Sequence, residues 1–205
     1  MDPRGVAPEP QELPRERFAD AAASMADAFL DDPGWVAVGP DDPRRRHNYI
    51  RRVCLGVLRV ARRWGGPTWF VERDGRVAGV LASLPPGAWP PPTLRALALQ
   101  AFGPIVAGPA VLWRSLVADN TMHGGHPDEP HLFVWMLTVQ PDFQRQGVGR
   151  ALLTMALARA EELGVRTYLD TANPDNLPYY ASFGFREEGS APLPRGATIW
   201  QMHHR

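Results

Sequence analysis

A short loop with two glycines holds the residue types best suited to binding an anion. Residues 144–150 read QRQGVGR and lie between an apolar run, residues 131–138, and an amphipathic stretch with helical periodicity. The first N–H groups of a helix have no partner inside it, and the helix dipole favours negative charge at that end. Glycine has no Cβ, so a phosphate can come close to the backbone, and the two arginines add positive charge. The loop therefore indicates a phosphate site, with a polar turn permitted by its glycines as the alternative.

Two other phosphate-binding motifs do not fit the same loop. A dinucleotide-binding G-x-G-x-x-G pattern would need glycine at position 152, where the chain has Leu152. A Walker A loop needs a lysine, and all 22 residues of the lysine and arginine set are arginine. The absence of lysine from the sequence also excludes enzymes that form a Schiff base on lysine. The pattern that remains is Q-x-x-G-x-G.

A second block of residues that could do chemistry follows downstream. Residues 173–185 read NPDNLPYYASFGF, with Asn173 seven residues before Tyr180 and Gly184 four residues after it. In this order, the two blocks resemble signature segments of the GNAT superfamily of N-acetyltransferases. Within that family, residues 126–203 are similar to puromycin acetyltransferase and its relatives, notably in the runs NLPYY and TIWQM. Before residue 126 the likeness is architectural only.

The resemblance implies a site for acetyl-CoA as a co-substrate. The site would lie between the strand that ends at Val139 and the strand that ends near Thr171, which splay apart in this family. A backbone N–H close to the end of the first strand would stabilise the oxyanion. The contacts implied are backbone groups at that strand end, the phosphate loop and two asparagines on the other side: Leu137, Thr138, Val139, Gln144, Arg145, Gln146, Gly147, Val148, Gly149, Arg150, Asn173 and Asn176.

Tyr180 takes the role of proton donor in this resemblance, in contact with the cofactor. A phenol with a pKa of about 10 can protonate a thiolate whose acid has a pKa of about 8.5 when the two are hydrogen bonded. The general base stays open. Some relatives carry Glu or His on the central strand where this chain has Phe133 and Trp135. The base is therefore a polar residue just upstream, such as Glu129 or His131, or a water chain, or no group at all.

The acceptor pocket in this family is built from the first two helices, the loop between them and the segment after the hairpin. Those regions contain Asp31, Asp32, Trp35 and Trp89. An acidic pair beside tryptophans would attract a cationic amine through charge and cation–π contact, although the same acids also make a good helix stop. Asp170 stands at a strand end and is expected to cap the turn that follows. None of the candidate residues has the spacing of a metal site.

Periodic patterns predict the elements that position these residues. Helices are expected at residues 15–30, 42–64, 147–163 and 174–183, with two short helices in 93–118 and a loop at 120–130. Strands are expected at residues 68–73, 76–83, 131–139, 165–171 and 198–203, the first two joined as a hairpin. The central run is apolar on both alternating faces, as in a strand covered on both sides. The order predicts an α+β fold whose mixed α/β sheet is flanked by helices, and the resemblance adds a splayed parallel strand pair.

The composition is that of a globular protein. The 205 residues fit one domain, expected at residues 13–205 after a loose N-terminal segment at residues 1–12. The net charge is zero, which gives no indication of a nucleic-acid partner. No apolar run approaches the length of about 18 residues that spans a membrane, so we expect no membrane partner and a cytoplasmic monomer or homodimer. The lone Cys54 excludes an intrachain disulfide and a thiolate metal cluster.

The function predicted from these observations is an acetyl-CoA-dependent N-acetyltransferase that acts on the amine of a small molecule, such as an antibiotic or a metabolite. A second hypothesis is an enzyme that acetylates a protein or peptide amine, which an open acidic groove would favour. A third is a non-catalytic sensor that binds acyl-CoA. Stabilisation by coenzyme A without turnover would favour the sensor, and the intact Tyr180 counts against it.

Overall fold

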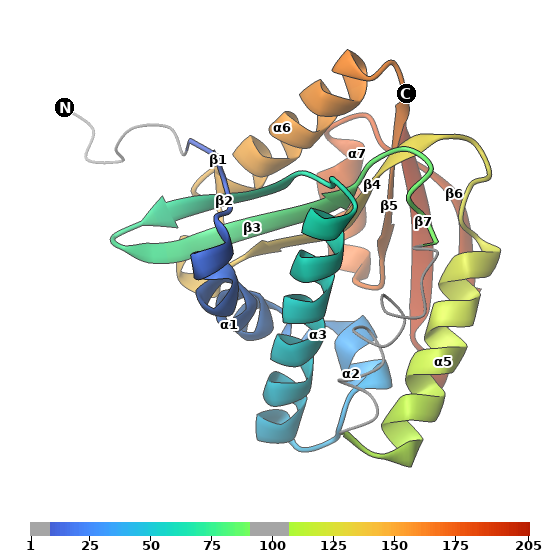
Figure 1. Ribbon diagram of the computed structural model, residues 1–205. Helices are drawn as coiled ribbons and strands as arrows, with labels where there is room; N and C mark the ends of the chain where they lie inside the picture. The colour runs from blue at the N-terminus through green and yellow to red at the C-terminus, as the bar shows by residue number, and fades with distance from the viewer. Residues whose placement is uncertain (1–8, 91–106) are drawn as a thin grey trace.

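The fold is a seven-stranded mixed sheet covered on both faces by helices (Figure 1). The structure, a computed structural model, describes residues 9–90 and 107–205. The strands lie in the order β1-β2-β3-β4-β5-β7-β6. Their bounds are β1 Gln11–Glu12, β2 Thr68–Arg73, β3 Arg76–Leu84, β4 His131–Val139, β5 Arg166–Thr171, β6 Arg186–Pro192 and β7 Thr198–His204.

The helices form two layers, one on each face of the sheet. Their bounds are α1 Phe18–Phe29, α2 Pro33–Val38, α3 Pro43–Arg63, α5 Pro109–Gly124, α6 Val148–Glu162 and α7 Leu177–Ala181. Helices α1 and α3 pack on each other and on β3, whereas α6 packs on β3, β4 and β5 from the other side (Figure 1). Short 3₁₀ turns join several elements: η1 Arg15–Arg17, η2 Pro141–Phe143, η3 Pro174–Asn176 and η4 Pro194–Gly196.

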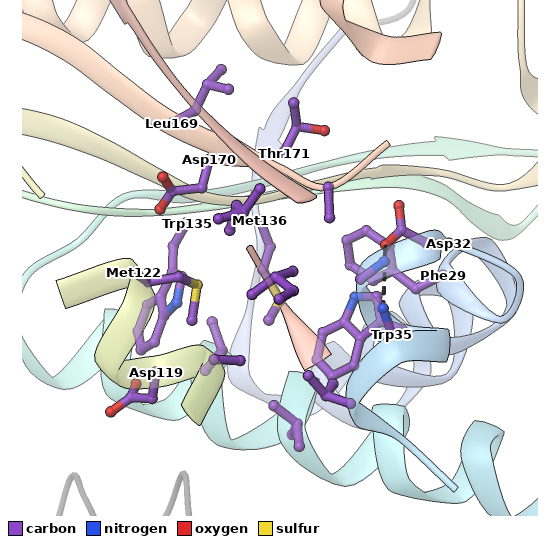
Figure 2. A pocket seen from close by; sticks show the side chains of 18 of the residues that line it. Phe29, Asp32, Trp35, Asp119, Met122, Trp135, Met136, Leu169, Asp170 and Thr171 are labelled. Carbon is purple, nitrogen blue, oxygen red and sulfur yellow. Dashed lines mark hydrogen bonds between the residues drawn. The ribbon is translucent and has the colours of Figure 1, made fainter. Parts of the chain in front are cut away.

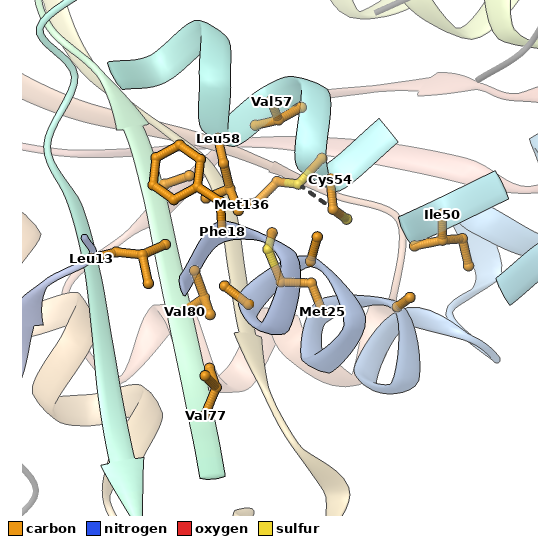
Figure 3. Packing of buried hydrophobic residues seen from close by; sticks show 14 of the residues in the cluster. Leu13, Phe18, Met25, Ile50, Cys54, Val57, Leu58, Val77, Val80 and Met136 are labelled. Atoms are coloured by element: carbon orange, nitrogen blue, oxygen red, sulfur yellow. Dashed lines mark hydrogen bonds between the residues drawn. The ribbon is translucent and has the colours of Figure 1, made fainter. Parts of the chain in front are cut away.

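Alternation along the strands separates a core on the α1–α3 face of the sheet from a core on the α6 face, and two smaller buried clusters are also present. On β3, Val80 points to the α1–α3 side and its neighbour Leu81 to the α6 side, as the period of two requires. Figure 3 shows the first core, where Met25 of α1 meets Cys54 of α3 and Met136 of β4. Cys54 is fully buried, which raises the pKa of its thiol, so this cysteine acts as a small apolar side chain.

The parallel pair β4–β5 separates after four residues. The pairing runs from His131 opposite Arg166 to Val134 opposite Leu169, and β4 then continues alone on this side to Val139. On its other edge β4 has a bulge against β3, because Ala82 pairs with Met136 while the next residue of β3 pairs with Val134. The bulge leaves Trp135 as the extra residue. The predicted fold class, with its splayed parallel pair, is therefore confirmed.

Three elements differ from the prediction. Helix α2 was expected to be a loop, but Asp32 caps it by accepting hydrogen bonds from the N–H groups of Gly34 and Trp35. Helix α5 continues to Gly124, through the start of the predicted loop. Strand β6 was missed because it lies at the sheet edge and is mostly exposed, so its sequence carries no apolar alternation.

Two predicted segments, residues 93–118 and residues 1–12, have different outcomes. The predicted short helices at residues 93–118 fall largely outside the described residues. At the N-terminus, the last two residues of the segment predicted to be loose form the edge strand β1, with Gln11 opposite Phe70 and Glu12 opposite Trp69. Within the described ranges, none of the helices is both long and apolar enough to cross a membrane.

Candidate active site

The phosphate loop leads directly from β4 into α6. Arg145 and Gly147 both have a left-handed backbone, with φ of 59° and 81°. Gly147 occupies the N-cap of α6, and among the described residues no side chain caps this helix. Two glutamine amides brace the loop instead: Gln144 Nε2 donates to the Val139 carbonyl at 3.4 Å, and Gln146 Nε2 donates to the Asp142 carbonyl at 2.8 Å. The first N–H groups of α6 are thus available to an anion.

Tyr179 supplies a further observation that fits a phosphate at this position. A Cβ at Gly149 would lie 2.9 Å from the Tyr179 hydroxyl oxygen and 3.3 Å from Val139 Cγ2, so a side chain there would force Tyr179 or Val139 to move. The Tyr179 hydroxyl is shielded from solvent and has no hydrogen-bond partner among the described residues. Beside it, the Arg150 guanidinium lies 4.8 Å from the centroid of the Phe183 ring. The loop therefore offers a donor hydroxyl and two cationic side chains around an uncapped helix end, which suits the pyrophosphate of acetyl-CoA.

We expect Gly149→Ala to weaken binding of coenzyme A without unfolding the protein. The added methyl group would push Tyr179 and the first turn of α6 apart. Loss of one charge-assisted hydrogen bond costs about 1.5–3 kcal/mol, so the dissociation constant should rise about 10- to 100-fold.

The measurement is calorimetric titration with coenzyme A. Gly124→Ala, where a Cβ meets nothing within 4 Å at the end of α5, is the matched control and should bind normally. Equal affinities of the two variants would contradict the assignment of the loop.

A cavity of about 300 Å³ opens beside the gap between β4 and β5 (Figure 2). Its walls come from α1, α2, α3, α5, β4, β5, α7 and β7, and most of the lining is apolar or aromatic. Three carboxylates interrupt this lining: Asp32, Asp119 and Asp170. Figure 2 shows Asp32 on one side with Phe29 and Trp35, and the other two carboxylates on the opposite side with Met122 and Trp135.

The structure brings six of the predicted residues to this cavity. Those that line it are Asp32, Trp35, Trp89, Leu137, Asn176 and Tyr180. Asp31 does not: its side chain is 91% exposed and faces Arg46 at 3.7 Å.

The two residues named as candidate bases also lie outside the lining. Glu129 is exposed and contacts Arg166 at 3.4 Å. His131 is buried and bonded through its two ring nitrogens, to the Glu129 carbonyl at 2.7 Å and to His126 Nε2 at 2.8 Å. Both are engaged in the structure at the start of β4, which does not favour them as bases.

Tyr180 reaches the cavity from α7. Burial is the main reason that its pKa lies above the ordinary value, and the nearby Tyr179 and Asp32 raise it further. The phenol therefore stays protonated at neutral pH and can act as a proton donor. The asparagines beside it brace the turn after β5: Asn173 Oδ1 accepts from the Asp175 N–H at 3.0 Å, and Asn176 Nδ2 donates to Thr171 Oγ1 at 3.3 Å.

The predicted capping role of Asp170 is wrong. Thr171 and Asn173 stabilise the following turn, whereas Asp170 Oδ1 accepts a hydrogen bond from the Tyr168 hydroxyl at 2.6 Å and the residue lines the cavity. Asp119 was not predicted as a site residue. It lies directly before the expected loop, and nothing in the sequence indicated that this part of α5 faces a cavity. A signal for Asp170 was present, since an acidic residue in an otherwise apolar buried strand usually has a partner or a ligand.

Comparisons with known proteins agree with this geometry. Residues 23–185 match the Acetyltransferase (GNAT) family. Acetyltransferase Atu2258 of Agrobacterium fabrum is 37% identical over 92 residues, which cover 42% of this chain and 67% of that protein.

Solved structures share the fold. The crystal structure described as histone acetyltransferase HPA2 and related acetyltransferase from Corynebacterium glutamicum has a TM-score of 0.69 at 20% identity, covering 97% of this chain and 96% of that one. The structure of yncA from Salmonella typhimurium with its cofactor acetyl-CoA has a TM-score of 0.57 at 15% identity, covering 98% of this chain and 94% of that one.

The family match spans most of the chain, from within α1 to the residue before β6, and includes both the phosphate loop and Tyr180. The chain therefore belongs to the GNAT family of acetyltransferases.

Proposed function

We propose that this protein is an acetyl-CoA-dependent N-acetyltransferase whose acceptor is the amine of a small molecule. The observation that carries the proposal is the cavity, which brings Tyr180 and the free part of β4 together with a lining suited to a compact ligand. Pockets of about 300–1,000 Å³ are typical of small-molecule sites, and a cavity of about 300 Å³ falls at the lower end. The likeness to puromycin acetyltransferase makes aminonucleosides the first acceptors to try.

Different residues of the cavity have different roles in the proposed acetyl transfer. Acetyl-CoA supplies a thioester whose carbonyl carbon is attacked by the neutral amine, so that a C–N bond forms and the C–S bond breaks. Asp32, which is close enough to Tyr180 to affect its pKa, can accept a hydrogen bond from the attacking amine and so position it. Tyr180 gives its proton to the departing thiolate and recovers one from the amide nitrogen. The stretch of β4 after the bulge at Trp135 is paired with β3 but has no partner strand on its β5 side, where a backbone N–H group can serve the oxyanion.

The alternatives make different demands on the same cavity. A protein acceptor is supported by the name of the Corynebacterium glutamicum relative, but it would have to insert a side chain or terminus between α2 and α5, which both line the cavity. An acyl-CoA sensor would need the phosphate loop but not a proton donor at position 180.

A thiol-release assay with acetyl-CoA tests the proposal. The acceptor panel contains aminonucleosides, diamines, amino acids and short peptides with free N-termini. Turnover with a small amine is expected. Turnover with peptides alone would favour the protein acceptor, and tight binding of coenzyme A without thiol release from any acceptor would favour the sensor.

A further inference from the structure

The three carboxylates that line the cavity differ in how they are satisfied. Asp32 Oδ1 accepts from two backbone N–H groups, at 3.0 and 3.4 Å, and so caps α2. Asp119 Oδ2 lies 3.6 Å from the imidazole of His123, one turn further along α5. Asp170 accepts one hydrogen bond, from Tyr168, but its other oxygen, Oδ2, is shielded from solvent and has no partner within the described residues. Asp170 is therefore the carboxylate that lacks a donor.

An unpaired buried oxygen of this kind is costly. A buried polar atom without a hydrogen bond costs about 1–3 kcal/mol, and more when the group is charged. Proteins keep such groups where a ligand satisfies them. The lining of the cavity also restricts what that ligand can be, because Met122, near Asp170 in Figure 2, has no donor, and no described residue, Trp135 included, donates a hydrogen bond to Asp170 Oδ2.

The position of Asp170 separates it from the reacting end of the cavity. Asp32 is close to Tyr180, since its charge contributes to the raised pKa of that phenol. Figure 2 places Asp170 and Asp119 on the opposite side from Asp32, with apolar side chains such as Met136 between them. A ligand that reacts beside Tyr180 can therefore extend along an apolar middle and end at Asp170.

We propose that Asp170 binds a second cationic group of the acceptor, so that the acceptor is a diamine with an apolar linker. One amine of this acceptor lies at Tyr180 and Asp32, and the remote ammonium donates a hydrogen bond to Asp170 Oδ2. This subsite rests on the proposed function for the identity of the first amine, but binding at Asp170 does not require turnover.

The charged and titratable groups around Asp170 support a dependence on pH. Burial raises the pKa of Asp170 to about 7, while the hydrogen bond from Tyr168 opposes this shift. Asp119 of α5 also lines the cavity and lies 3.6 Å from His123, and burial holds the pKa of His126 at about 3, so that imidazole is neutral. Because the ionised carboxylate binds a cation better than the neutral acid, affinity for a diamine should rise as the pH increases from 6 to 8.

The test compares diaminohexane with hexylamine, which differ by the remote amine alone. Binding is measured by calorimetry in the presence of coenzyme A. The wild-type protein should bind diaminohexane at least about tenfold more tightly, as expected for one charge-assisted hydrogen bond. A series from diaminobutane to diaminooctane should show one preferred length, because the two ends of the cavity are fixed.

Two variants test whether the preference for the diamine over hexylamine depends on Asp170. Asp170→Asn keeps the acceptor atom for Tyr168, so it should fold, bind hexylamine as before and lose both the preference for the diamine and its pH dependence. Asp31→Asn makes the same chemical change at an exposed carboxylate outside the cavity and should keep the preference. Equal binding of the two ligands by the wild type, or an unchanged preference in Asp170→Asn, would overturn the subsite.

The outcomes also separate this inference from the proposed function. A diamine preference that depends on Asp170, together with no thiol release, would support the subsite and reject the enzyme. Efficient acetylation of a monoamine, unaffected by Asp170→Asn, would support the enzyme and reject the subsite. If the variant does not fold, the comparison of the two ligands on the wild-type protein still decides the question.

Discussion

Replacing Tyr180 with phenylalanine is expected to lower kcat by about 10²–10⁴-fold, the usual contribution of a general acid. The change removes one oxygen from a buried side chain whose ring contacts Tyr179 and Phe185, so the packing of α7 should be kept. Without the phenol the thiolate must leave unprotonated or take a proton from water. Binding of coenzyme A should change little, because the phosphate loop is untouched. Steady-state kinetics with the best acceptor of the panel provide the measurement.

Tyr179→Phe is the comparison that makes this result specific. The two tyrosines are adjacent, but Tyr179 faces Gly149 and the start of α6, whereas Tyr180 lines the cavity. Tyr179→Phe should therefore raise the dissociation constant for coenzyme A and leave the chemical step intact. If Tyr180→Phe retains full kcat, another group protonates the thiolate and the assignment fails.

The pH profile gives an independent check on Tyr180. Burial holds the pKa of this phenol above its ordinary value of about 10, so the acidic form persists through the alkaline range. Ionisation of Tyr180 should therefore not lower the rate of the wild-type protein below about pH 10. If the rate declines there in the wild type and not in Tyr180→Phe, the phenol loses its proton earlier than expected.

Met25→Ala should lower the free energy of unfolding strongly, although the residue lies away from the cavity. Met25 is fully buried in the core between α1, α3 and the sheet (Figure 3). Replacing a buried methionine by alanine removes apolar contacts and leaves a cavity, at a cost of about 2–5 kcal/mol in the free energy of unfolding. Chemical denaturation followed by circular dichroism would measure the change.

Met155→Ala is the matched control for this substitution. Met155 lies on α6, is 38% exposed and is outside the buried clusters. Truncating it should alter stability by less than about 0.5 kcal/mol, as is usual for surface positions. Similar losses in the two variants would mean that the α1–α3 core is not the main source of stability on that face.

The parts of the site that lie close together in the sequence could be predicted from it. The phosphate loop needs one strand end, two glycines and one helix start, all within a dozen residues, so its composition was enough to indicate an anion site. Tyr180 was predicted from its spacing to Asn173 and Gly184 together with the family resemblance, because all three lie within a dozen residues of sequence. The buried strands β4 and β5 were equally clear, since each is an apolar run bounded by polar residues.

The cavity could not be predicted in the same way. Its residues come from segments as distant as Asp32, Asp119, Asp170 and Ile199, and their approach depends on how α2 and α5 pack beside the sheet. Sequence patterns report which face of an element is buried, but not which other element covers it. The role of Asp170 illustrates the limit: its position at a strand end suggested a cap, and the hydrogen bond from Tyr168 decided otherwise.

The sequence by itself determined the order of the main elements and the family, and it predicted the anion-binding loop and Tyr180 as the proton donor, because these depend on local conformation and short spacings. The tertiary structure alone decided which carboxylates share the cavity, that Asp31, Glu129 and His131 lie outside it, and that β4 and β5 part after four residues. The physical reason is that side-chain packing between distant segments, rather than local propensity, sets the distances across a binding cavity.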